Sequence, residues 1–249
     1  KIHREWVDGI KSRLPANVPF IQIDSHNIVP MWIASTHEES AAYTFRPKIN
    51  AKLAEYLTEF PALIRHPYKA DKSSPKIDWE GTLESLDLDK SVGAVDWIKS
   101  GYRGGIHTLE TFIKSRLQKY EQFRNDPVEN AQSDLSPYFH FGQIAPQRAN
   151  LEVKRRLTST NAKSVEKFCE QSITRRELCD NFCYFNKNYD NFTAAPAWAV
   201  KTLNDHCNDK RDYLYTLQEF DDGLTHDILW NAAQMQLKKD GKMHGYVSN

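Results

Sequence analysis

The chain has 249 residues, of which 40% are hydrophobic and 27% charged, a composition typical of folded proteins rather than disordered ones. Its 33 basic and 33 acidic residues cancel, so a nucleic-acid or membrane-surface partner would need a local patch of charge. No apolar run approaches the roughly 20 residues that cross a bilayer, and the first residues do not follow the pattern of a secretory signal. We therefore expect an intracellular protein without a membrane span.

The cysteines and aromatic residues give weaker indications. Cys169, Cys179, Cys183 and Cys207 form no CxxC pair, which favours buried thiols in a reducing compartment. A zinc site of Cys179, Cys183 and His206 is an alternative, although structural zinc sites favour tighter spacings. Aromatic side chains make up 12% of the chain, which is compatible with stacking on a planar ligand but also with an aromatic core.

The first 60 residues show a strand-to-helix pattern. Residues 20–24 predict a short buried strand, and residues 28–34 form a second apolar run that Pro30 interrupts. From Ile49 onward apolar residues recur at helical spacing, with Pro47 suited to the first turn and Pro61 ending the pattern. This alternation predicts the end of an α/β layer.

Residues 61–103 are predicted to form a surface linker. They contain His66-Pro67, the sequence Lys-Ser-Ser-Pro at 72–75, and an acid-rich stretch at 84–96. We place the domain boundary here.

Helical periodicity dominates the rest of the chain. A helix is predicted after Gly104-Gly105, with one apolar stripe formed by Ile106, Leu109, Phe112, Ile113, Leu117 and Tyr120. Further helices are predicted at 147–157, at 164–185 with Ser164 as the cap, and at 198–203. A last helix follows Thr225 as the cap and stops at Gly241. The second part is therefore predicted to be an all-α domain.

Common catalytic signatures are absent. The sequence has no GxSxG, GxxxxGK[ST] or HExxH motif, which disfavours hydrolases and NTPases. His140, His226 and His244 are candidate acids or bases, but a lone histidine is more often a surface or capping group. Eight basic and five acidic residues between 141 and 183, with a later cluster of Lys238, Lys239 and Lys242, could neutralise a few phosphates. Solvated helix faces explain these clusters equally well.

Two short segments carry more chemistry than their surroundings. Residues 135–143 combine hydroxyl groups, a proline turn and aromatic rings, which suits a phosphate beside a ring system, although an ordinary aromatic turn is the alternative. In residues 173–182 polar side chains interrupt an apolar helix. Glu177 and Asn181 lie one turn apart and could converge with Arg176 on a polar ligand, unless they belong to a solvated helix face.

Several of these segments together resemble one known family. The chain is similar to class II cyclobutane pyrimidine dimer photolyases, of the photolyase/cryptochrome family, at residues 24–30, 124–127, 135–143, 175–183, 229–234 and 241–245. The resemblance implies an α/β plus all-α fold. The C-terminal part of a Rossmann-like antenna domain would occupy residues 1–60 and a linker residues 61–103, and most of a helical FAD-binding domain would occupy residues 104–249.

The resemblance also implies a reaction. Reduced FAD would split cyclobutane pyrimidine dimers in damaged DNA by light-driven electron transfer, with an antenna chromophore of unknown identity as a possible second pigment. The protein would be a monomer, intracellular, and nuclear if eukaryotic.

The resemblance assigns roles residue by residue. FAD would be held by Tyr120, Leu135, Ser136, Pro137 and Tyr138, with Arg176, Asp180 and Asn181 beside it. Trp230 matches an electron-relay tryptophan, although a core aromatic is the alternative. Arg175 and Tyr246 would face the lesion or the adjacent strand.

The sequence departs from the family pattern in two places. Gln171 stands where a glutamate that hydrogen-bonds the dimer is expected, and a glutamine cannot act as a carboxylate. Family features expected before residue 1 and after residue 249 are absent, so we expect a fragment, truncated at both ends, with impaired activity. The alternatives are a non-catalytic, cryptochrome-like flavin- or DNA-binding remnant and a helical interaction domain without a cofactor.

Overall fold

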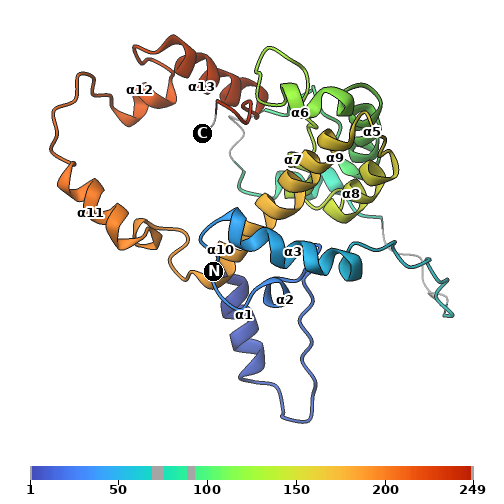
Figure 1. Ribbon diagram of the computed structural model, residues 1–249. Coiled ribbons are helices and arrows are strands. Elements are labelled where there is room, and N and C mark those ends of the chain that lie inside the picture. Colours follow the sequence, from blue (N-terminus) through green and yellow to red (C-terminus); the bar gives the residue numbers. More distant parts are fainter. Residues whose placement is uncertain (1, 69–75, 89–92, 248–249) are drawn as a thin grey trace.

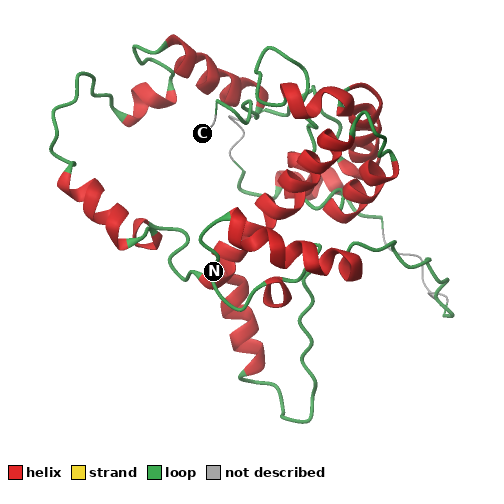
Figure 2. Cartoon of the chain, viewed as in Figure 1, coloured by secondary structure: helices red, strands yellow, loops and turns green. Residues whose placement is uncertain are grey.

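The computed structural model describes residues 2–68, 76–88 and 93–247, and the regular elements in these ranges are all helical (Figures 1 and 2). In chain order they are α1 (Ile2–Lys11), α2 (Met31–Ala34), α3 (Ala42–Tyr56), α4 (Trp79–Glu84), α5 (Gly101–Ser115), η1 (Leu117–Lys119), α6 (Tyr120–Phe123), α7 (Ser136–His140), α8 (Pro146–Arg155), α9 (Ala162–Cys169), η2 (Glu170–Arg175), α10 (Arg176–Phe185), η3 (Phe192–Ala194), α11 (Ala197–Asp205), α12 (Leu217–Asp221) and α13 (Ile228–Asp240).

The strand predicted at residues 20–24 does not form. The segment is irregular, and the side chains of Ile21 and Ile23 are 78% and 79% exposed. A strand needs a neighbour to pair its backbone groups, and no described segment supplies one. The α/β layer predicted from this pattern is therefore not present in the described residues.

The helix predicted from Ile49 begins seven residues earlier, at Ala42. Pro47 consequently lies inside α3 and not in its first turn. At this interior position its missing N–H removes one intrahelical hydrogen bond. Phe45 and Ile49 are both fully buried, so packing of this face extends the helix toward its N-terminus in spite of the proline.

The predicted linker is irregular over most of its described length and carries the short helix α4. Residues 76–88 are exposed, apart from the half-buried Gly81. The sequence at 72–75 and part of the acid-rich stretch lie outside the described residues.

A first hydrophobic core lies between α5, α6, α7, α8 and α9. Leu109 and Phe112, on the predicted stripe of α5, are buried there beside Tyr138 and Phe168. The helix α5 begins at Gly101, before the predicted start, and so includes Gly104 and Gly105. A Cβ on Gly105 would lie 3.2 Å from the Tyr138 ring, so glycine allows α5 to approach α7 closely.

A second core joins the N-terminal part to the helical part. Val29, Phe45 and Ile49 pack with Ile173 of η2, and Cys169 contacts both cores. The helix predicted at 164–185 forms as α9, η2 and α10, in which η2 is a π-helical segment. Ser164 is not the cap, because α9 begins earlier, and its hydroxyl instead accepts a hydrogen bond from the backbone N–H of Glu121.

The C-terminal part loops away from the cores and returns with α13 beside the α6 region (Figure 1). Asp227 caps α13 in place of the predicted Thr225, because its carboxylate accepts from two backbone N–H groups of the first turn. The predicted stop is confirmed, since Gly241 adopts the left-handed conformation at φ 63°.

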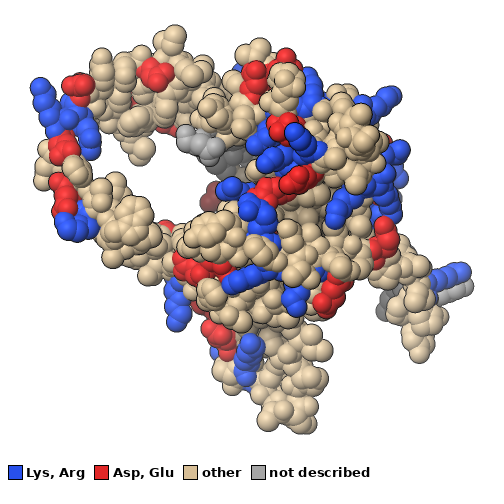
Figure 3. Space-filling model, viewed as in Figure 1, with Lys and Arg blue, Asp and Glu red and all other residues tan. Residues whose placement is uncertain are grey.

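Charges of both signs are interspersed over the face shown in Figure 3, in keeping with the zero net charge. No helix among the described residues is both long and apolar enough to cross a membrane.

Candidate functional site

Two neighbouring hollows of about 440 and 460 Å³ lie where α6, α7, η2 and the end of the chain meet. They share Tyr120, Ser133, Ser136 and Gln171 as lining residues, and we call them together the central cavity. Each has a volume within the range of about 300 to 1,000 Å³ that is common for ligand sites. The first hollow is mainly polar, and the second has Phe139 and Phe168 in its wall.

Tyr120 forms the rigid base of the central cavity. It begins α6, and its ring makes edge contacts with Phe112 and Phe168 at centroid distances of 5.4 and 6.1 Å. Burial raises the pKa of Tyr120 to about 12, which keeps the phenol protonated at physiological pH. The phenol can therefore donate a hydrogen bond to a ligand.

The loop before α7 is fixed by a buried ionic network. Asp134 adopts a left-handed conformation, with φ 58°, and its carboxylate pairs with Arg116, which directly follows α5, and with Lys242 from the chain end. Burial alone would raise the pKa of Asp134, but the hydrogen bonds and charges of Lys242 and Arg116 outweigh it and lower the pKa. Ser133 and Ser136, close to Asp134 in the sequence, both line the central cavity.

Gln171 lies in the π-helical segment η2. The wider helical turn displaces side chains from the α-helical register, a feature common at functional sites. Ser172 anchors this turn, because its hydroxyl lies 2.9 Å from the Asn150 side-chain oxygen and 2.7 Å from the Phe168 carbonyl. Gln171 contributes to both hollows of the central cavity.

Arg176 lines the second hollow together with the two serines. One guanidinium nitrogen donates to the His26 carbonyl at 3.0 Å, while Nη1 is buried without a hydrogen-bond partner among the described residues. His26 in turn lies 3.4 Å from the Asp180 carboxylate. Burial raises the pKa of Asp180, and His26 and Arg176 offset only part of this rise. A buried donor without a partner is costly, so this end of the cavity suits an anionic or polar ligand group.

Glu177 and Asn181 do not converge on the central cavity. Both are fully buried, and both bind backbone groups of the N-terminal part. The Glu177 carboxylate accepts from the N–H groups of Ile28 and Val29 at 2.7 and 3.4 Å. The Asn181 side chain accepts from the N–H of Glu39 at 2.8 Å and donates to the carbonyl of His37 at 3.2 Å. These polar groups therefore hold the N-terminal part on α10.

His140, one of the candidate acids or bases, lines the second hollow. Of the residues to which the resemblance assigns a role, the structure brings five to the central cavity. They are Tyr120, Ser136, Gln171, Arg176 and Tyr246. Leu135 and Tyr138 instead belong to the first core, where the Tyr138 hydroxyl donates to the Lys99 carbonyl at 2.7 Å. Pro137 is half-buried in α7 without lining either hollow.

The remaining candidates lie outside the central cavity. Asp180 lines a separate hollow of about 470 Å³ with His26. Arg175 is more than half exposed and lies 3.3 Å from Glu170. Trp230 lies on α13, where its ring contacts Phe220 at a centroid distance of 5.2 Å.

Among the residues of the cavity wall, the sequence assigned no individual role to His26 or Ser133, and it singled out Lys242 only as one of a basic cluster. His26 and Lys242 both lie in segments that carry the family resemblance, which was the available signal. The lining residues together offer cations, hydroxyl groups and aromatic surface. This combination can hold a ligand that has both a planar ring and phosphate groups. The described residues contain no group of three potential metal ligands.

The chain is similar to curated proteins over nearly its whole length. It is 48% identical over 245 residues to the deoxyribodipyrimidine photo-lyase of Potorous tridactylus, covering 98% of this chain and 46% of that protein. It is 40% identical to the protein of the same name from Oryza sativa subsp. japonica, covering 98% of this chain and 50% of the relative. The photo-lyase of Methanothermobacter thermautotrophicus is 38% identical, with 99% of this chain and 53% of that protein covered. The chain thus spans about half the length of the curated relatives it matches.

Solved structures share the fold. A cryptochrome from Synechocystis sp. PCC6803 aligns with a TM-score of 0.60 and 17% identity, covering 90% of this chain and 46% of that one. A class III photolyase from Agrobacterium tumefaciens aligns with a TM-score of 0.53 and 24% identity, covering 72% of this chain and 36% of the other. No protein-family profile matches the chain.

Proposed function

Because the chain belongs to the photolyase/cryptochrome family, we propose that it is part of a light-driven DNA-repair enzyme that splits cyclobutane pyrimidine dimers. The observation that carries this proposal is the convergence of Tyr120, Ser136, Gln171 and Arg176 on one cavity, from segments far apart in the sequence. The relatives that bear the name photo-lyase support the reaction class.

FAD is the cofactor that we propose for the central cavity. The unpartnered Nη1 of Arg176 and the hydroxyl groups of Ser133 and Ser136 suit its phosphates and ribityl chain, and Phe139 and Phe168 supply apolar wall. When bound, FAD supplies an electron to the dimer under light. Leu135, Pro137 and Tyr138 would support this wall from α7, while Asp180 and Asn181 would act indirectly by holding the N-terminal part in place.

We assign the damaged DNA to the side of the cavity where Gln171 and Tyr246 lie. Both line the more polar hollow, together with Arg124 and Lys242, so charge is available for a nearby phosphate. Arg175, exposed on the next turn of the helix, would contact the adjacent strand. The amide of Gln171 can hydrogen-bond a base but cannot release a proton, so we expect weaker repair than a glutamate would give.

Two further assignments extend this proposal. Trp230 would pass electrons toward the cavity, and its edge contact with Phe220 places it in a small aromatic cluster on the α12–α13 unit. Residues 1–60 would be the end of a Rossmann-like antenna domain joined by the 61–103 linker to the helical domain. The exposed side chains of Ile21 and Ile23 suit a segment that gains a packing partner in longer relatives.

The cofactor assignment is tested by titrating the purified chain with FAD and following flavin fluorescence. Arg176→Ala should weaken binding roughly tenfold, since a hydrogen bond to a charged group contributes about 1.5 kcal/mol or more. The exposed Arg13→Ala is the matched control and should leave the affinity unchanged. Failure of the wild-type chain to bind FAD at all would contradict the assignment.

The reaction is tested by illuminating ultraviolet-damaged DNA with the flavin-loaded chain, its FAD first reduced with dithionite under anaerobic conditions, and counting the remaining dimers, with a dark sample as the control. Gln171→Glu should increase the number of dimers repaired per bound flavin, because a carboxyl group is restored beside the lesion. Equal dimer counts in light and dark for both proteins would leave the chain a binding protein and refute the proposed activity.

A further inference from the structure

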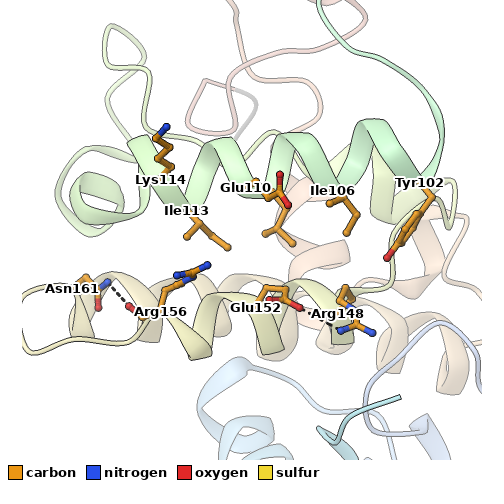
Figure 4. Close-up of a pocket in the computed structure, with 10 residues that line it drawn as sticks. Tyr102, Ile106, Glu110, Ile113, Lys114, Arg148, Glu152, Arg156 and Asn161 are labelled. Carbon is orange, nitrogen blue, oxygen red and sulfur yellow. Dashed lines mark hydrogen bonds and ion pairs between the residues drawn. The ribbon is translucent and has the colours of Figure 1, made fainter. Parts of the chain in front are cut away.

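A large hollow of the described structure lies away from the central cavity. It measures about 860 Å³ and runs between α5 and α8, and we call it the α5–α8 groove (Figure 4). None of its lining residues borders the central cavity. Those residues are Tyr102, Ile106, Leu109, Glu110, Ile113, Lys114, Arg148, Glu152, Arg156 and Asn161.

The groove has an apolar floor and a charged rim. Ile106, Leu109 and Ile113 lie on one face of α5 at helical spacing, and Figure 4 shows Ile106 and Ile113 directed across the groove toward α8. On the rim, Arg148 lies 3.3 Å from Glu152. An apolar trough edged by charges is the surface on which amphipathic helices bind.

Two cations of the rim are not neutralised. The side chains of Lys114 and Arg156 have no carboxylate partner among the described residues, whereas Arg148 is shared between Glu152 and the ring of Phe60. The lining also includes the carboxylates of Glu110 and Glu152, so its charged side chains leave one net positive charge. The groove therefore has a modest preference for an occupant that has acidic side chains as well as an apolar face.

The linker of the same chain contains such a segment. Trp79 and Leu83 of α4, and Leu86 just after it, recur at helical spacing and are 71%, 61% and 49% exposed. The acidic residues Glu80, Glu84 and Asp87 alternate with them. The side-chain hydrogen bonds described for α4 stay within the segment, as in the cap that Asp78 forms with the N–H of Gly81.

We propose that residues 78–88, the α4 segment, dock into the α5–α8 groove of their own chain. Trp79, Leu83 and Leu86 would cover the apolar floor, and the acidic residues would meet Lys114 and Arg156. Neither surface has another described partner, and each supplies what the other lacks.

A short tether joins the α4 segment to the helices that form the groove. Eight residues, 89 to 96, separate it from Trp97, whose indole N–H donates to the Asp240 carbonyl. Eight extended residues span about 27 Å, and the 15-residue helix α5 is about 22 Å long. The tether is therefore comparable in length with the groove, and the covalent link gives the segment a high effective concentration near it.

Hydrogen exchange of the full chain, measured by mass spectrometry, tests the proposal. Backbone amides of residues 79–86 should exchange at least roughly tenfold more slowly than in a synthetic peptide of residues 76–88, because docking protects the helix. Exchange at the peptide rate would overturn the proposal. Protection that disappears when the protein is diluted would also overturn the proposal. It would show that the groove binds the α4 segment of a second copy in a dimer.

Two variants separate docking from other causes of protection. Leu83→Asp alters only an exposed side chain of α4, and Arg156→Glu reverses one charge of the rim, so neither should unfold the cores. Each should return residues 79–86 to the exchange rate of the peptide. Leu63→Asp, at a fully exposed linker position outside the α4 segment, is the matched control and should retain protection. Protection that survives both Leu83→Asp and Arg156→Glu would refute the contact. The test does not depend on FAD or on repair activity.

Discussion

Replacing Glu177 with glutamine should remove the pH dependence that this carboxyl group imposes on stability. Glu177 is fully buried, and its carboxylate accepts from the N–H groups of Ile28 and Val29. Burial raises its pKa from 4.5 to about 7, although the two backbone hydrogen bonds and the charge of Arg176 act in the opposite direction. The protonated form is therefore the more stable one in the folded protein.

The sign and size of the effect follow from this raised pKa. The stability that Glu177 contributes is fully present below its unfolded-state pKa of 4.5 and is lost as the pH rises through about 7. The difference between the two values corresponds to about 3 kcal/mol at high pH. Glu177→Gln keeps the shape and one acceptor oxygen but cannot ionise. The variant should therefore not lose stability from this position as the pH rises.

Urea unfolding between pH 5 and pH 9 measures the difference. The free energy of unfolding of Glu177→Gln should be close to that of the wild type at pH 5 and exceed it by up to about 3 kcal/mol at pH 9. Glu5→Gln, at an exposed position of α1, controls for the loss of one charge. A variant that is less stable than the wild type by a constant amount at every pH would show that Glu177 is ionised throughout, and would refute the reasoning.

Three further substitutions test the packing. Asp134→Ala should lower the free energy of unfolding by about 3 kcal/mol in urea, because it leaves the buried Arg116 charge without its carboxylate. An unchanged urea midpoint would show that the ion pairs of Asp134 do not stabilise the fold. Asn181→Ala should cost about 2 kcal/mol and speed hydrogen exchange at Glu39, whose N–H loses its acceptor. Equal exchange rates at Glu39 in the variant and the wild type would show that the Asn181 side chain does not protect this amide. Gly104→Ala should destabilise strongly in thermal unfolding, since the added Cβ would lie 1.9 Å from the Lys99 carbonyl oxygen. Gly9→Ala, which meets nothing within 4 Å inside α1, should instead be neutral or stabilising by about 0.5 to 1 kcal/mol.

Short-range features of the sequence predicted the helical part well. The apolar stripe through Leu109 and Phe112 predicts the buried face of α5, and Gly241 predicts the end of α13. Such features depend on side-chain periodicity and on backbone conformations within a few residues, so a short stretch of sequence is enough to predict them. The strand expected at residues 20–24 does not form, because a strand needs a neighbouring strand to pair with and the local sequence does not specify one.

The order of residues along the chain also determined which segments could carry chemistry. The family resemblance, which rests on the sequence alone, gives Tyr120, Ser136, Gln171 and Arg176 their candidate roles. Their meeting at one cavity was decided by the packing of α6, α7 and η2. The π-helical turn at Gln171 has no signal in the periodicity, since it is a change of register within a continuous apolar helix.

What only the tertiary structure decided is how each buried polar group is satisfied. Glu177 and Asn181 have the residue types and spacing of a ligand site, yet they bind backbone groups about 140 to 150 residues away along the chain. Asp134 joins Arg116 to Lys242, which the sequence separates by more than 100 residues. A buried polar group must find a partner, but its choice between a ligand and a distant backbone segment depends on which segments the hydrophobic cores bring together.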